Sequence, residues 1–281
     1  MQQWNKLTPK EEQVIVRKGT ELPFTGEYTH FSKKGTYICR RCNTILYHSQ
    51  NKFKSDCGWP SFDQVLPGAV TEISDTDGIR VEIQCTKCDA HLGHVFRGEK
   101  LTPKDIRYCV NSISLKFIPA SKLGRAIFAG GCFWGVEYYM KKIPGVLETT
   151  AGYIGGNEQN PTYDEVSHHK TNHLEAVEVI YDLEKVSYET IAKMFFEIHD
   201  PTQANGQGPD IGEQYLSSIF YLNAEQKKIA QRLIKTLRKK GLKVATKVRK
   251  AERFWKAEEY HQDYYTRKGS LPYCHGYTKR F

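Results

Sequence analysis

Eight cysteines carry most of the chemistry that this 281-residue sequence offers, and four of them form two C-x-x-C pairs. Cys39 and Cys42 make the first pair, and Cys85 and Cys88 make the second, with 42 residues between the pairs. Two such turns can place four thiolates around one tetrahedral zinc ion, and a closed four-thiolate site leaves no open position for a substrate. Disulfides or a redox-active C-x-x-C are the alternatives, but two matched pairs favour a structural zinc site.

The long insert between the two pairs argues against a zinc ribbon of the nucleic-acid-binding type, whose pairs usually lie about 15–20 residues apart. The insert contains the segment CGWPSF at 57–62, which brings Cys57 together with aromatic residues. A cysteine in an aromatic-rich insert indicates a functional site rather than a spacer.

Two solitary cysteines lie in contexts that favour a reactive thiolate. Cys132 follows two glycines between a predicted strand and a predicted helix. The free N–H groups and the dipole of a helix N-terminus lower the pKa of a thiol. Cys109 lies on a predicted strand with Arg107 and Asn111 on the same face, and a nearby guanidinium also favours the thiolate. The alternative for Cys132 is a buried cysteine packed beside Phe and Trp.

The predicted secondary structure that must position these cysteines changes near residue 120. Residues 8–11 (TPKE) combine a capping residue, a proline at the first helical position and a carboxylate at the third, so they predict the start of a helix. Short apolar or alternating runs then alternate with turns rich in Gly, Asn and Asp. They predict mainly antiparallel β structure, with strands such as 35–38, 79–83 and 108–117.

Proline, serine and glycine cluster at 118–124 and indicate a domain boundary. We expect a first domain at 1–119, a linker at 120–125 and a second domain at 126–281. In the second domain an apolar strand at 126–129 precedes strands that alternate with helical segments, which indicates an α/β or α+β fold. The expected helices are 134–143, 188–198 and 224–240, the last with Asn223 as N-cap and Gly241 as its end.

The formal net charge of +9 is concentrated at 225–256, where 13 Lys or Arg residues stand against two Glu. Such a stretch could attract nucleic acid or an acidic protein, but a solvated helix face followed by a basic strand is the favoured interpretation. No apolar run is long enough to span a bilayer, and the N-terminus lacks the apolar stretch of a secretory signal. We therefore expect a cytoplasmic protein with no membrane and no nucleic-acid partner.

The motifs together resemble two related families of repair enzymes. Residues 1–119 resemble methionine sulfoxide reductase B in the two C-x-x-C pairs and in the segments 57–62 (CGWPSF), 91–96 (HLGHVF) and 107–111 (RYCVN). Residues from about 125 to the end resemble methionine sulfoxide reductase A in the segments 131–135 (GCFWG), 160–163 (NPTY), 173–177 (HLEAV), 207–215 (QGPDIGEQY) and 257–262 (AEEYHQ).

The resemblance implies an α+β protein, with a mainly antiparallel β domain that holds the structural zinc and a C-terminal α/β sandwich with a ferredoxin-like core. It implies a bifunctional enzyme that reduces methionine sulfoxide in oxidised proteins or as the free amino acid. The first domain would take the R epimer and the second the S epimer. A cysteine would attack the sulfoxide sulfur and become a sulfenic acid. A second cysteine would then form a disulfide, which a thioredoxin-like dithiol reduces without an organic cofactor.

For the first domain the resemblance implies Cys109 as nucleophile, Cys57 as resolving cysteine and His94, ahead of His91, as proton donor. Arg107 and Asn111 would position the nucleophile and bound water, and the apolar wall would be Trp59 and Phe96.

For the second domain it implies Cys132 as nucleophile and Glu175 as acid, a role that requires burial to raise the carboxyl pKa. Cys274, the one cysteine without another role, would resolve Cys132. The methyl group would lie against Phe133 and Trp134, and the sulfoxide oxygen or a water would be bound by Tyr163, Asp210 and Tyr215.

Three positions depart from the usual pattern of these families. Asp56 stands where glycine is common, which predicts a stiffer or more acidic loop before Cys57, and Asn172 and Leu174 replace smaller residues beside Glu175. Two other classes of protein remain as alternatives. A zinc-containing nucleic-acid-binding protein would use the basic stretch, and a thiol peroxidase would leave Glu175 and the two tryptophans Trp59 and Trp134 without a role.

Overall fold

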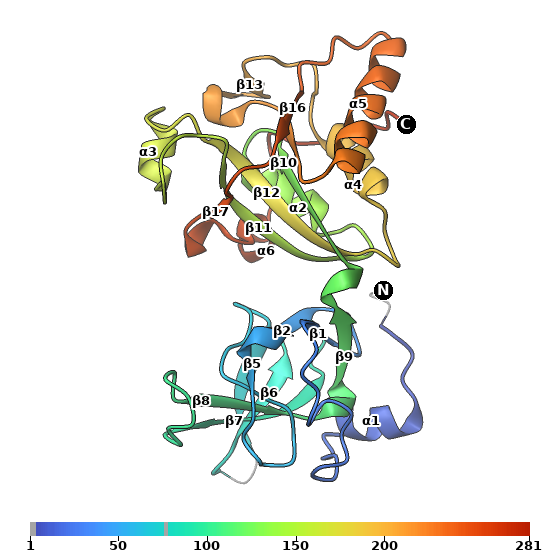
Figure 1. The fold of residues 1–281 in the computed structure, drawn as a ribbon, viewed down its shortest axis with the longest axis vertical. Helices are drawn as coiled ribbons and strands as arrows, with labels where there is room; N and C mark the ends of the chain where they lie inside the picture. The colour runs from blue at the N-terminus through green and yellow to red at the C-terminus, as the bar shows by residue number, and fades with distance from the viewer. Residues whose placement is uncertain (1–3, 76–77) are drawn as a thin grey trace. The chain divides into compact units, whose positions relative to one another are not determined.

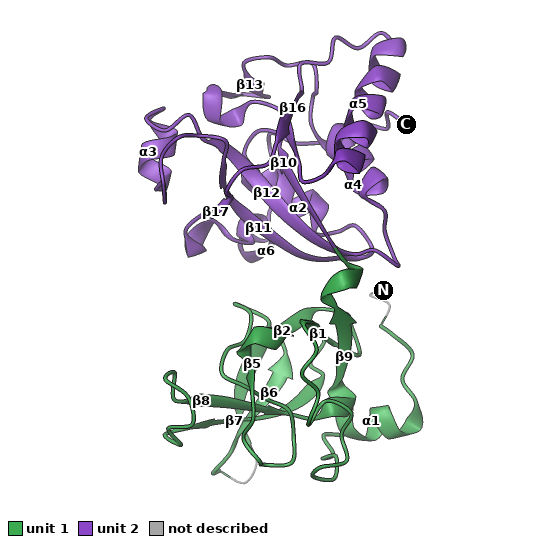
Figure 2. Ribbon diagram, in the orientation of Figure 1, with its two compact units in different colours: residues 1–123 green, residues 124–281 purple. Residues whose placement is uncertain are grey.

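The computed structural model describes residues 4–75 and 78–281. The chain separates into two compact units, Met1–Leu123 (unit 1) and Gly124–Phe281 (unit 2), shown in Figure 2. The segment expected as a linker, 120–125, consists of the 3₁₀ turn η3 (Ala120–Lys122) and the beginning of strand β10 (Leu123–Ala129). Strand β10 therefore starts three residues earlier than the apolar run at 126–129 indicates.

Unit 1 begins with helix α1 (Pro9–Ile15), whose capping box is formed as expected. The Thr8 hydroxyl accepts from the Glu11 backbone N–H, and the Glu11 carboxylate accepts from the Thr8 backbone N–H. Val14 and Ile15 are the buried residues of this helix. A local hydrogen-bonding signal of this kind needs no tertiary contact to act, which is why the sequence predicts it well.

The rest of unit 1 is antiparallel β structure in two sheets (Figure 1). A three-stranded sheet has the order β2-β1-β9, and a six-stranded sheet has the order β3-β4-β8-β7-β6-β5. The strand bounds are β1 (Gly35–Cys39), β2 (Ile45–His48), β3 (Lys52–Phe53), β4 (Ser61–Phe62), β5 (Val70–Ser74), β6 (Val81–Cys85), β7 (His91–Arg97), β8 (Ile106–Val110) and β9 (Leu115–Pro119). Their inner faces share one core that includes Tyr37, Tyr47, Phe62 and Leu92.

The expectation of one continuous strand over 108–117 is wrong. Strand β8 ends at Val110, and the 3₁₀ turn η2 (Ser112–Ser114) carries the chain to β9 in the other sheet. Hydrogen bonds from Asn111 N to Leu92 O and from the Ser114 hydroxyl to His91 O hold this turn against β7. The apolar run continues through the turn because both strands bury side chains, so periodicity alone does not reveal the break.

Unit 2 is built on a six-stranded mixed sheet with the order β16-β15-β10-β12-β11-β17. The pairs β10/β15, β11/β12 and β11/β17 are antiparallel, whereas β15/β16 is parallel. The remaining strand bounds are β11 (Val146–Ile154), β12 (Leu174–Asp182), β13 (Gly206–Gln207), β14 (Asp210–Ile211), β15 (Ser218–Tyr221), β16 (Lys247–Lys250) and β17 (Trp255–Lys256). Mixed helix and sheet structure is thus confirmed, while the ferredoxin-like core stays a prediction.

The helices of unit 2 follow the expected ranges closely. They are α2 (Phe133–Met140), α3 (Tyr163–Ser167), α4 (Tyr188–Ile198), α5 (Ala224–Lys239) and α6 (Tyr264–Lys268). The Asn223 side chain caps α5 by accepting from Gln226 N, and Gly241 follows the helix with a φ of 90°. Helix α2 begins one residue earlier than expected, and its N-cap is Cys132.

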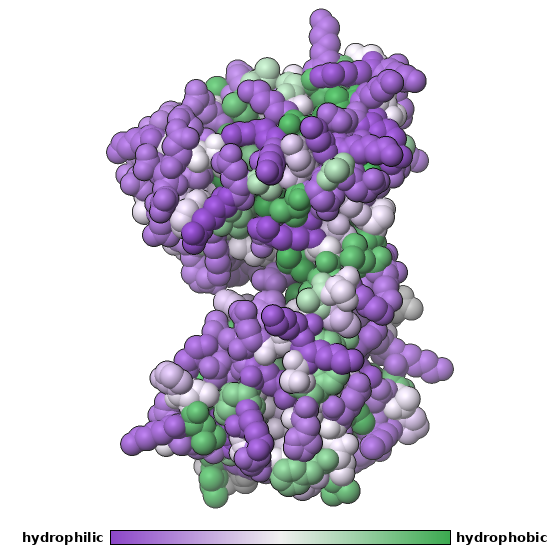
Figure 3. Space-filling model, viewed as in Figure 1, coloured by the Kyte–Doolittle hydropathy of each residue, from purple (hydrophilic) through white to green (hydrophobic). Residues whose placement is uncertain are grey.

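The basic stretch 225–256 contains the exposed face of α5. The helix buries Ala230, Leu233, Ile234 and Leu237, while its lysines and arginines face solvent, as expected for a solvated amphipathic helix. Hydrophilic residues cover most of the surface of each unit on the face shown in Figure 3. Within residues 4–75 and 78–281, no helix combines the length and the apolar character needed to cross a membrane.

Candidate active sites and metal centre

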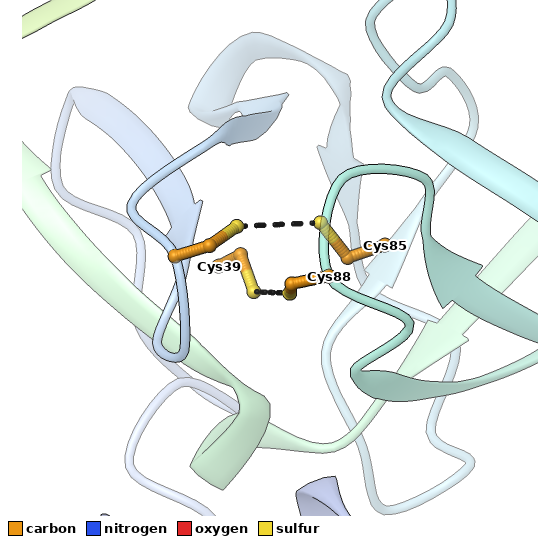
Figure 4. Close-up of side chains that lie close together, drawn as sticks. Cys39, Cys85 and Cys88 are labelled. Carbon is orange, nitrogen blue, oxygen red and sulfur yellow. Dashed lines mark hydrogen bonds between the residues drawn. The ribbon is translucent and has the colours of Figure 1, made fainter. Parts of the chain in front are cut away.

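The four cysteines of the C-x-x-C pairs form one cluster in unit 1. The Sγ atoms of Cys39 and Cys88 lie 3.6 Å apart and those of Cys42 and Cys85 lie 3.5 Å apart, so each close contact joins one turn to the other (Figure 4). All four sulfurs lie within 4.8 Å of one another. Four sulfurs at about 2.3 Å from a tetrahedral zinc ion would be about 3.8 Å apart. The four thiols are free, and their arrangement fits a metal ion rather than two disulfides.

The second cysteine group of unit 1 pairs Cys57 with Cys109. Their Sγ atoms are 3.7 Å apart although 52 residues separate them in the chain. Cys109 lies on β8, and its Cα is the register partner of Ser61 on β4, the strand that follows Cys57. Pairing of these two strands therefore brings together the two cysteines that the sequence assigns as nucleophile and resolving partner.

The two sulfurs act on each other's ionisation. The contact with Cys109 and hydrogen bonds with the hydroxyls of Ser55 and Ser61 lower the pKa of Cys57 to about 4. The contact with Cys57 and the burial of Cys109 raise the Cys109 pKa, although Arg107 acts in the opposite direction. One of the two sulfurs is therefore easier to ionise than a free cysteine, and a negative charge on it opposes ionisation of the other.

Arg107 is held firmly beside the pair. Its Nε and Nη2 each donate to the Glu99 carboxylate at 2.7 Å, and its guanidinium lies 4.3 Å from the centre of the Phe96 ring. Phe96 and Arg107 are cross-strand partners on β7 and β8. Phe96 therefore supports the arginine, and an apolar wall for a methyl group would use the remaining surface of this half-buried ring.

The two histidines of β7 have different environments. His94 is the register partner of Cys109, and its Nε2 lies 2.9 Å from Asp75 Oδ2. His91 is buried, with Nδ1 2.6 Å from Glu82 Oε1 and Nε2 without a partner. Because the carboxylate of Glu82 can only accept from Nδ1–H, neutral His91 presents a lone pair at Nε2. Burial lowers the His91 pKa, so His91 is better suited to accept a proton than to donate one.

Trp59 and Asn111 are fixed by the segment that precedes β1. The Trp59 indole N–H donates to Glu21 O at 2.9 Å, and Asn111 Oδ1 accepts from Glu21 N at 2.9 Å. Asn111 Nδ2 also donates to Leu92 O. Asn111 therefore joins three segments around the cysteine pair, and its amide serves the fold of the site as well as any bound water.

In unit 2 the N-terminus of α2 brings Cys132 and Glu175 together. Cys132 is buried, and the backbone N–H of the next residue, Phe133, donates to Glu175 Oε2 at 3.0 Å. Burial, with the charges of Asp210 and Cys274, raises the pKa of Glu175 to about 8. The carboxyl group is thus protonated at neutral pH, the state that a proton donor requires.

The helix N-terminus is one of several influences on the Cys132 pKa. The Trp134 N–H lowers it, as expected, whereas the contact with Cys274 and burial raise it by more. The contact with Cys132 and the neighbouring imidazole of His275 lower the pKa of Cys274 to about 6. As in unit 1, the two sulfurs of the pair act on each other's ionisation.

An aromatic cluster lies around Cys132. The Trp134 ring stacks on Tyr264 at 3.7 Å between centroids, and its indole N–H donates to His261 Nδ1 at 3.0 Å. The His261 ring contacts Phe133 and Tyr163, with centroids 4.9 and 4.5 Å apart. The structure therefore brings together three residues expected from the sequence, Phe133, Trp134 and Tyr163, around a histidine that the sequence analysis gave no role.

The residues expected to bind the sulfoxide oxygen or a water lie near the titratable groups of the unit 2 site. Burial raises the pKa of Tyr163 to about 12 and also raises the pKa of Tyr215, and negative charge on Glu175 or Cys132 would raise both further. Asp210 accepts from the Tyr273 hydroxyl at 2.8 Å through Oδ1, and its Oδ2 is buried without a partner. Two neutral phenols and a carboxylate oxygen can thus serve as hydrogen-bonding groups near Cys132 and Cys274.

Sequence reasoning gave no role to several residues that hold these sites in place. Glu258 accepts from the Tyr153 hydroxyl and from Tyr163 N, both at 2.8 Å. Glu258 and His261 lie in the segment 257–262, so the resemblance contained a signal for them. The partners of the unit 1 site had no such signal, because they come from separate strands and loops: Asp75, Glu82 and Glu99.

The guanidinium of Arg107 should control ionisation of the Cys57/Cys109 pair. In Arg107→Met the packing on Phe96 is largely kept but the positive charge is lost, so less thiolate forms. We expect alkylation of the pair by iodoacetamide at pH 4, near the pKa of Cys57, to slow about fivefold or more, as measured by mass spectrometry of the cysteine peptides. The matched control is Arg97→Met, which breaks the bidentate contact of Arg97 with Glu72. Equal rates in both variants would contradict the assigned effect.

Comparison with known proteins gives a separate result for each unit. Residues 124–280 match the family described as peptide methionine sulfoxide reductase, and residues 7–119 match the SelR domain. The peptide methionine sulfoxide reductase MsrA of Nautilia profundicola is 47% identical over 150 residues, which are 53% of this chain and 87% of that protein. Peptide methionine sulfoxide reductase B3 of Arabidopsis thaliana is 53% identical over 116 residues, which are 41% of this chain and 66% of that protein.

Among solved structures, the crystal structure of Mxr1 from Saccharomyces cerevisiae in reduced form is similar, with a TM-score of 0.53 and 31% identity. The similarity covers 58% of this chain and 94% of that one. The family matches cover both units, and the candidate sites lie within them. The chain belongs to the peptide methionine sulfoxide reductases, as a fusion of an N-terminal SelR (MsrB) domain with a C-terminal MsrA domain.

Proposed function

We propose that unit 1 reduces the R epimer of methionine sulfoxide and unit 2 the S epimer, each through its own cysteine pair. The observation that carries this proposal is the presence of two separate pairs of reduced cysteines, Cys57 with Cys109 and Cys132 with Cys274. In each pair the two sulfurs act on each other's ionisation, and each pair adjoins a charged or titratable group. The assignment of epimers rests on the family resemblance of each unit.

In unit 1 the proton of Cys109 passes to Cys57 across 3.7 Å, and the Cys109 thiolate attacks the sulfoxide sulfur. His94, opposite Cys109 on β7, donates a proton to the sulfoxide oxygen. Methionine leaves, and Cys109 retains the oxygen as a sulfenic acid. The Cys57 thiol then forms a disulfide with Cys109, and water is released. Arg107 stabilises the thiolate, and Trp59 and Phe96 hold the substrate methyl group.

In unit 2 the same sequence of steps uses different groups. Cys132 is the nucleophile, and protonated Glu175 donates to the sulfoxide oxygen. Phe133 and Trp134 contact the methyl group, while the oxygen or a water is bound by Tyr163, Asp210 and Tyr215. Cys274 resolves the Cys132 sulfenic acid as a disulfide. A thioredoxin-like dithiol restores both pairs by exchange, in the reducing cytoplasm and with oxidised proteins or free methionine sulfoxide as substrates.

The first test uses separated epimers of a methionine sulfoxide substrate, dithiothreitol as reductant, and two single variants. Cys109→Ser should abolish reduction of the R epimer and leave the S rate within twofold of wild type. Cys132→Ser should do the reverse, because each nucleophile acts in its own unit. Methionine formation is measured by chromatography.

Each variant is the control for the other, since both keep the full chain and one active unit. Failure of the wild type to reduce either epimer would refute the activity. Loss of both activities in one variant would refute independent sites, and an exchange of epimers would refute the assignment of the units.

The raised pKa of Glu175 predicts a pH limit for the S epimer alone. A proton donor with a pKa of about 8 loses its proton as the pH rises through that value, so S reduction should fall above about pH 8. In Glu175→Gln the amide can still accept from Phe133 N but has no acidic proton. We expect its S activity to fall about 100-fold and to lose the alkaline decline, while R activity is unchanged. An alkaline decline retained in Glu175→Gln would assign it to another group.

We further propose that the four-cysteine cluster holds one structural zinc ion. Four thiolates in a closed tetrahedral set are ligands that zinc prefers, and the ion would join the turn after β1 to the turn after β6. Removal of zinc would leave four sulfurs, three of them on buried cysteines, close together without a ligand, so unit 1 should lose its cooperative unfolding transition.

The test treats the full chain with a strong chelator and measures bound zinc, thermal unfolding and both epimer activities. We expect one zinc per chain, loss of R activity on chelation and retention of S activity. Cys42→Ser should reproduce these effects without chelator. R activity and unfolding that are unaffected by complete removal of metal would refute a structural role.

A further inference from the structure

His275 is a buried histidine in direct contact with Cys274, and nothing in the function described so far uses it. Its Nδ1 lies 3.1 Å from Cys274 Sγ, within hydrogen-bonding distance for a sulfur. Its Nε2 lies 2.7 Å from the carbonyl oxygen of Gly130, the glycine that precedes the Gly131-Cys132 motif. One imidazole therefore joins the sulfur of Cys274 to the backbone beside Cys132.

The carbonyl oxygen of Gly130 determines which nitrogen carries the proton. A carbonyl can only accept a hydrogen bond, so Nε2 of neutral His275 is the N–H donor and Nδ1 bears the lone pair. That lone pair faces the Cys274 sulfur. The arrangement consists of a thiol, a base and a third group that orients the base, which is the geometry of an activated cysteine nucleophile.

The backbone of the Cys132 motif leaves space for this ring. A Cβ on Gly135 would lie 2.2 Å from His275 Nδ1, and a Cβ on Gly131 would lie 3.4 Å from His275 Cε1. Immediately after His275, hydrogen bonds from Gly276 N to Ile198 O and from Thr278 N to Glu197 O hold the chain in place. Backbone segments thus enclose the imidazole, and its position is fixed by the backbone rather than by side-chain packing alone.

We propose that His275 is the base and acid of the resolving step in unit 2, a role that rests on the proposed function. His275 Nδ1 takes the proton of the Cys274 thiol, and the resulting thiolate attacks the sulfur of the Cys132 sulfenic acid. The S–S bond forms as the S–O bond breaks, and the proton on His275 passes to the departing hydroxide to give water. No external oxidant or reductant is needed, because the sulfenic acid is itself the oxidant.

Other titratable groups face the same sulfur and must be separated from His275 by experiment. They are Cys132 at the N-cap of α2, Glu175 on β12, Asp210 on β14 and Tyr273 on the C-terminal segment. His199, at the end of α4, faces His275 itself. Asp210 is the competing base, since its carboxylate also contacts Cys274.

The test separates the two chemical steps in the full chain. The background variant Cys109→Ser silences unit 1, and the S epimer is supplied without reductant so that each unit 2 site turns over once. Release of methionine reports attack by Cys132, and loss of free Cys274 thiol, by rapid acid quench and mass spectrometry, reports disulfide formation. The test variant is His275→Gln, whose amide can reach Gly130 O but cannot take up a proton near pH 7.

We expect His275→Gln to release methionine within twofold of the background rate while its disulfide forms at least about fivefold more slowly at pH 7. Loss of the base leaves fewer Cys274 thiolates, although each is more nucleophilic. The sulfenic acid should accumulate and be trapped by dimedone. Above about pH 8.5, where an ordinary cysteine ionises by itself, the difference should narrow.

The control variant is His199→Gln, which removes another buried imidazole bound to a carbonyl, with Ser217 rather than a sulfur at its other nitrogen. It should leave the ratio of the two rates unchanged. An unchanged ratio in His275→Gln would overturn the proposal and leave Asp210 as the base. Equal slowing of both steps would also overturn it, because His275 would then only hold the site together. Failure of the background protein to release methionine would instead refute the proposed function.

Discussion

The close approach of two sulfurs that are distant in the chain is the constraint on which both units depend. Cys57 and Cys109 are 52 residues apart, and the pairing of β4 with β8 brings their sulfurs to 3.7 Å. In unit 2 the partner of Cys132 comes from a C-terminal segment that has little regular structure and is held to the end of α4 by backbone hydrogen bonds. A disulfide requires sulfurs about 2 Å apart, so in the proposed mechanism each fold must bring the pair close and still leave one sulfur accessible to substrate.

Near the candidate sites, some backbone segments lie so close together that a side chain at a glycine position would collide with the neighbouring segment. Gly93 has a φ of 152°, and a Cβ there would lie 2.0 Å from Cys109 O, so β7 and β8 could not pair at Cys109. Asp56 and Asn172, which depart from the usual family pattern, have φ values of 54° and 57°. Asp and Asn tolerate this left-handed conformation better than most residues. Asp56 and Asn172 can therefore adopt the same backbone conformation as a smaller residue at these positions, and each adds a side chain.

Local signals predicted the elements well, and tertiary contacts account for what was missed. The capping box at Thr8, the helix 188–198 and the Asn223 cap depend on residues that are close together in the chain. The break after Val110 depends on contacts with β7, and the seating of His275 depends on glycines about 140 residues earlier. Sorting the cysteines by spacing and context identified the four-cysteine cluster and the two solitary cysteines Cys109 and Cys132 as candidates, whereas their pairing with Cys57 and Cys274 came from the family resemblance. Spacing and context could not identify Glu99 and Glu258, because their carboxylates contact other side chains of the site rather than the cysteines.

The two units place different titratable groups beside their cysteine pairs. Unit 1 places a permanent positive charge, Arg107, beside its cysteines, which favours a thiolate throughout the neutral range. Among the described residues, the main influences on the Cys132 pKa include no cation. Unit 2 instead contains a carboxyl group, Glu175, that burial keeps neutral up to about pH 8. In the proposed mechanism, neutral Glu175 avoids repulsion of a Cys132 thiolate and also supplies a proton. Because both effects end when the carboxyl ionises, we expect the activity of unit 2 to depend on pH more steeply than that of unit 1.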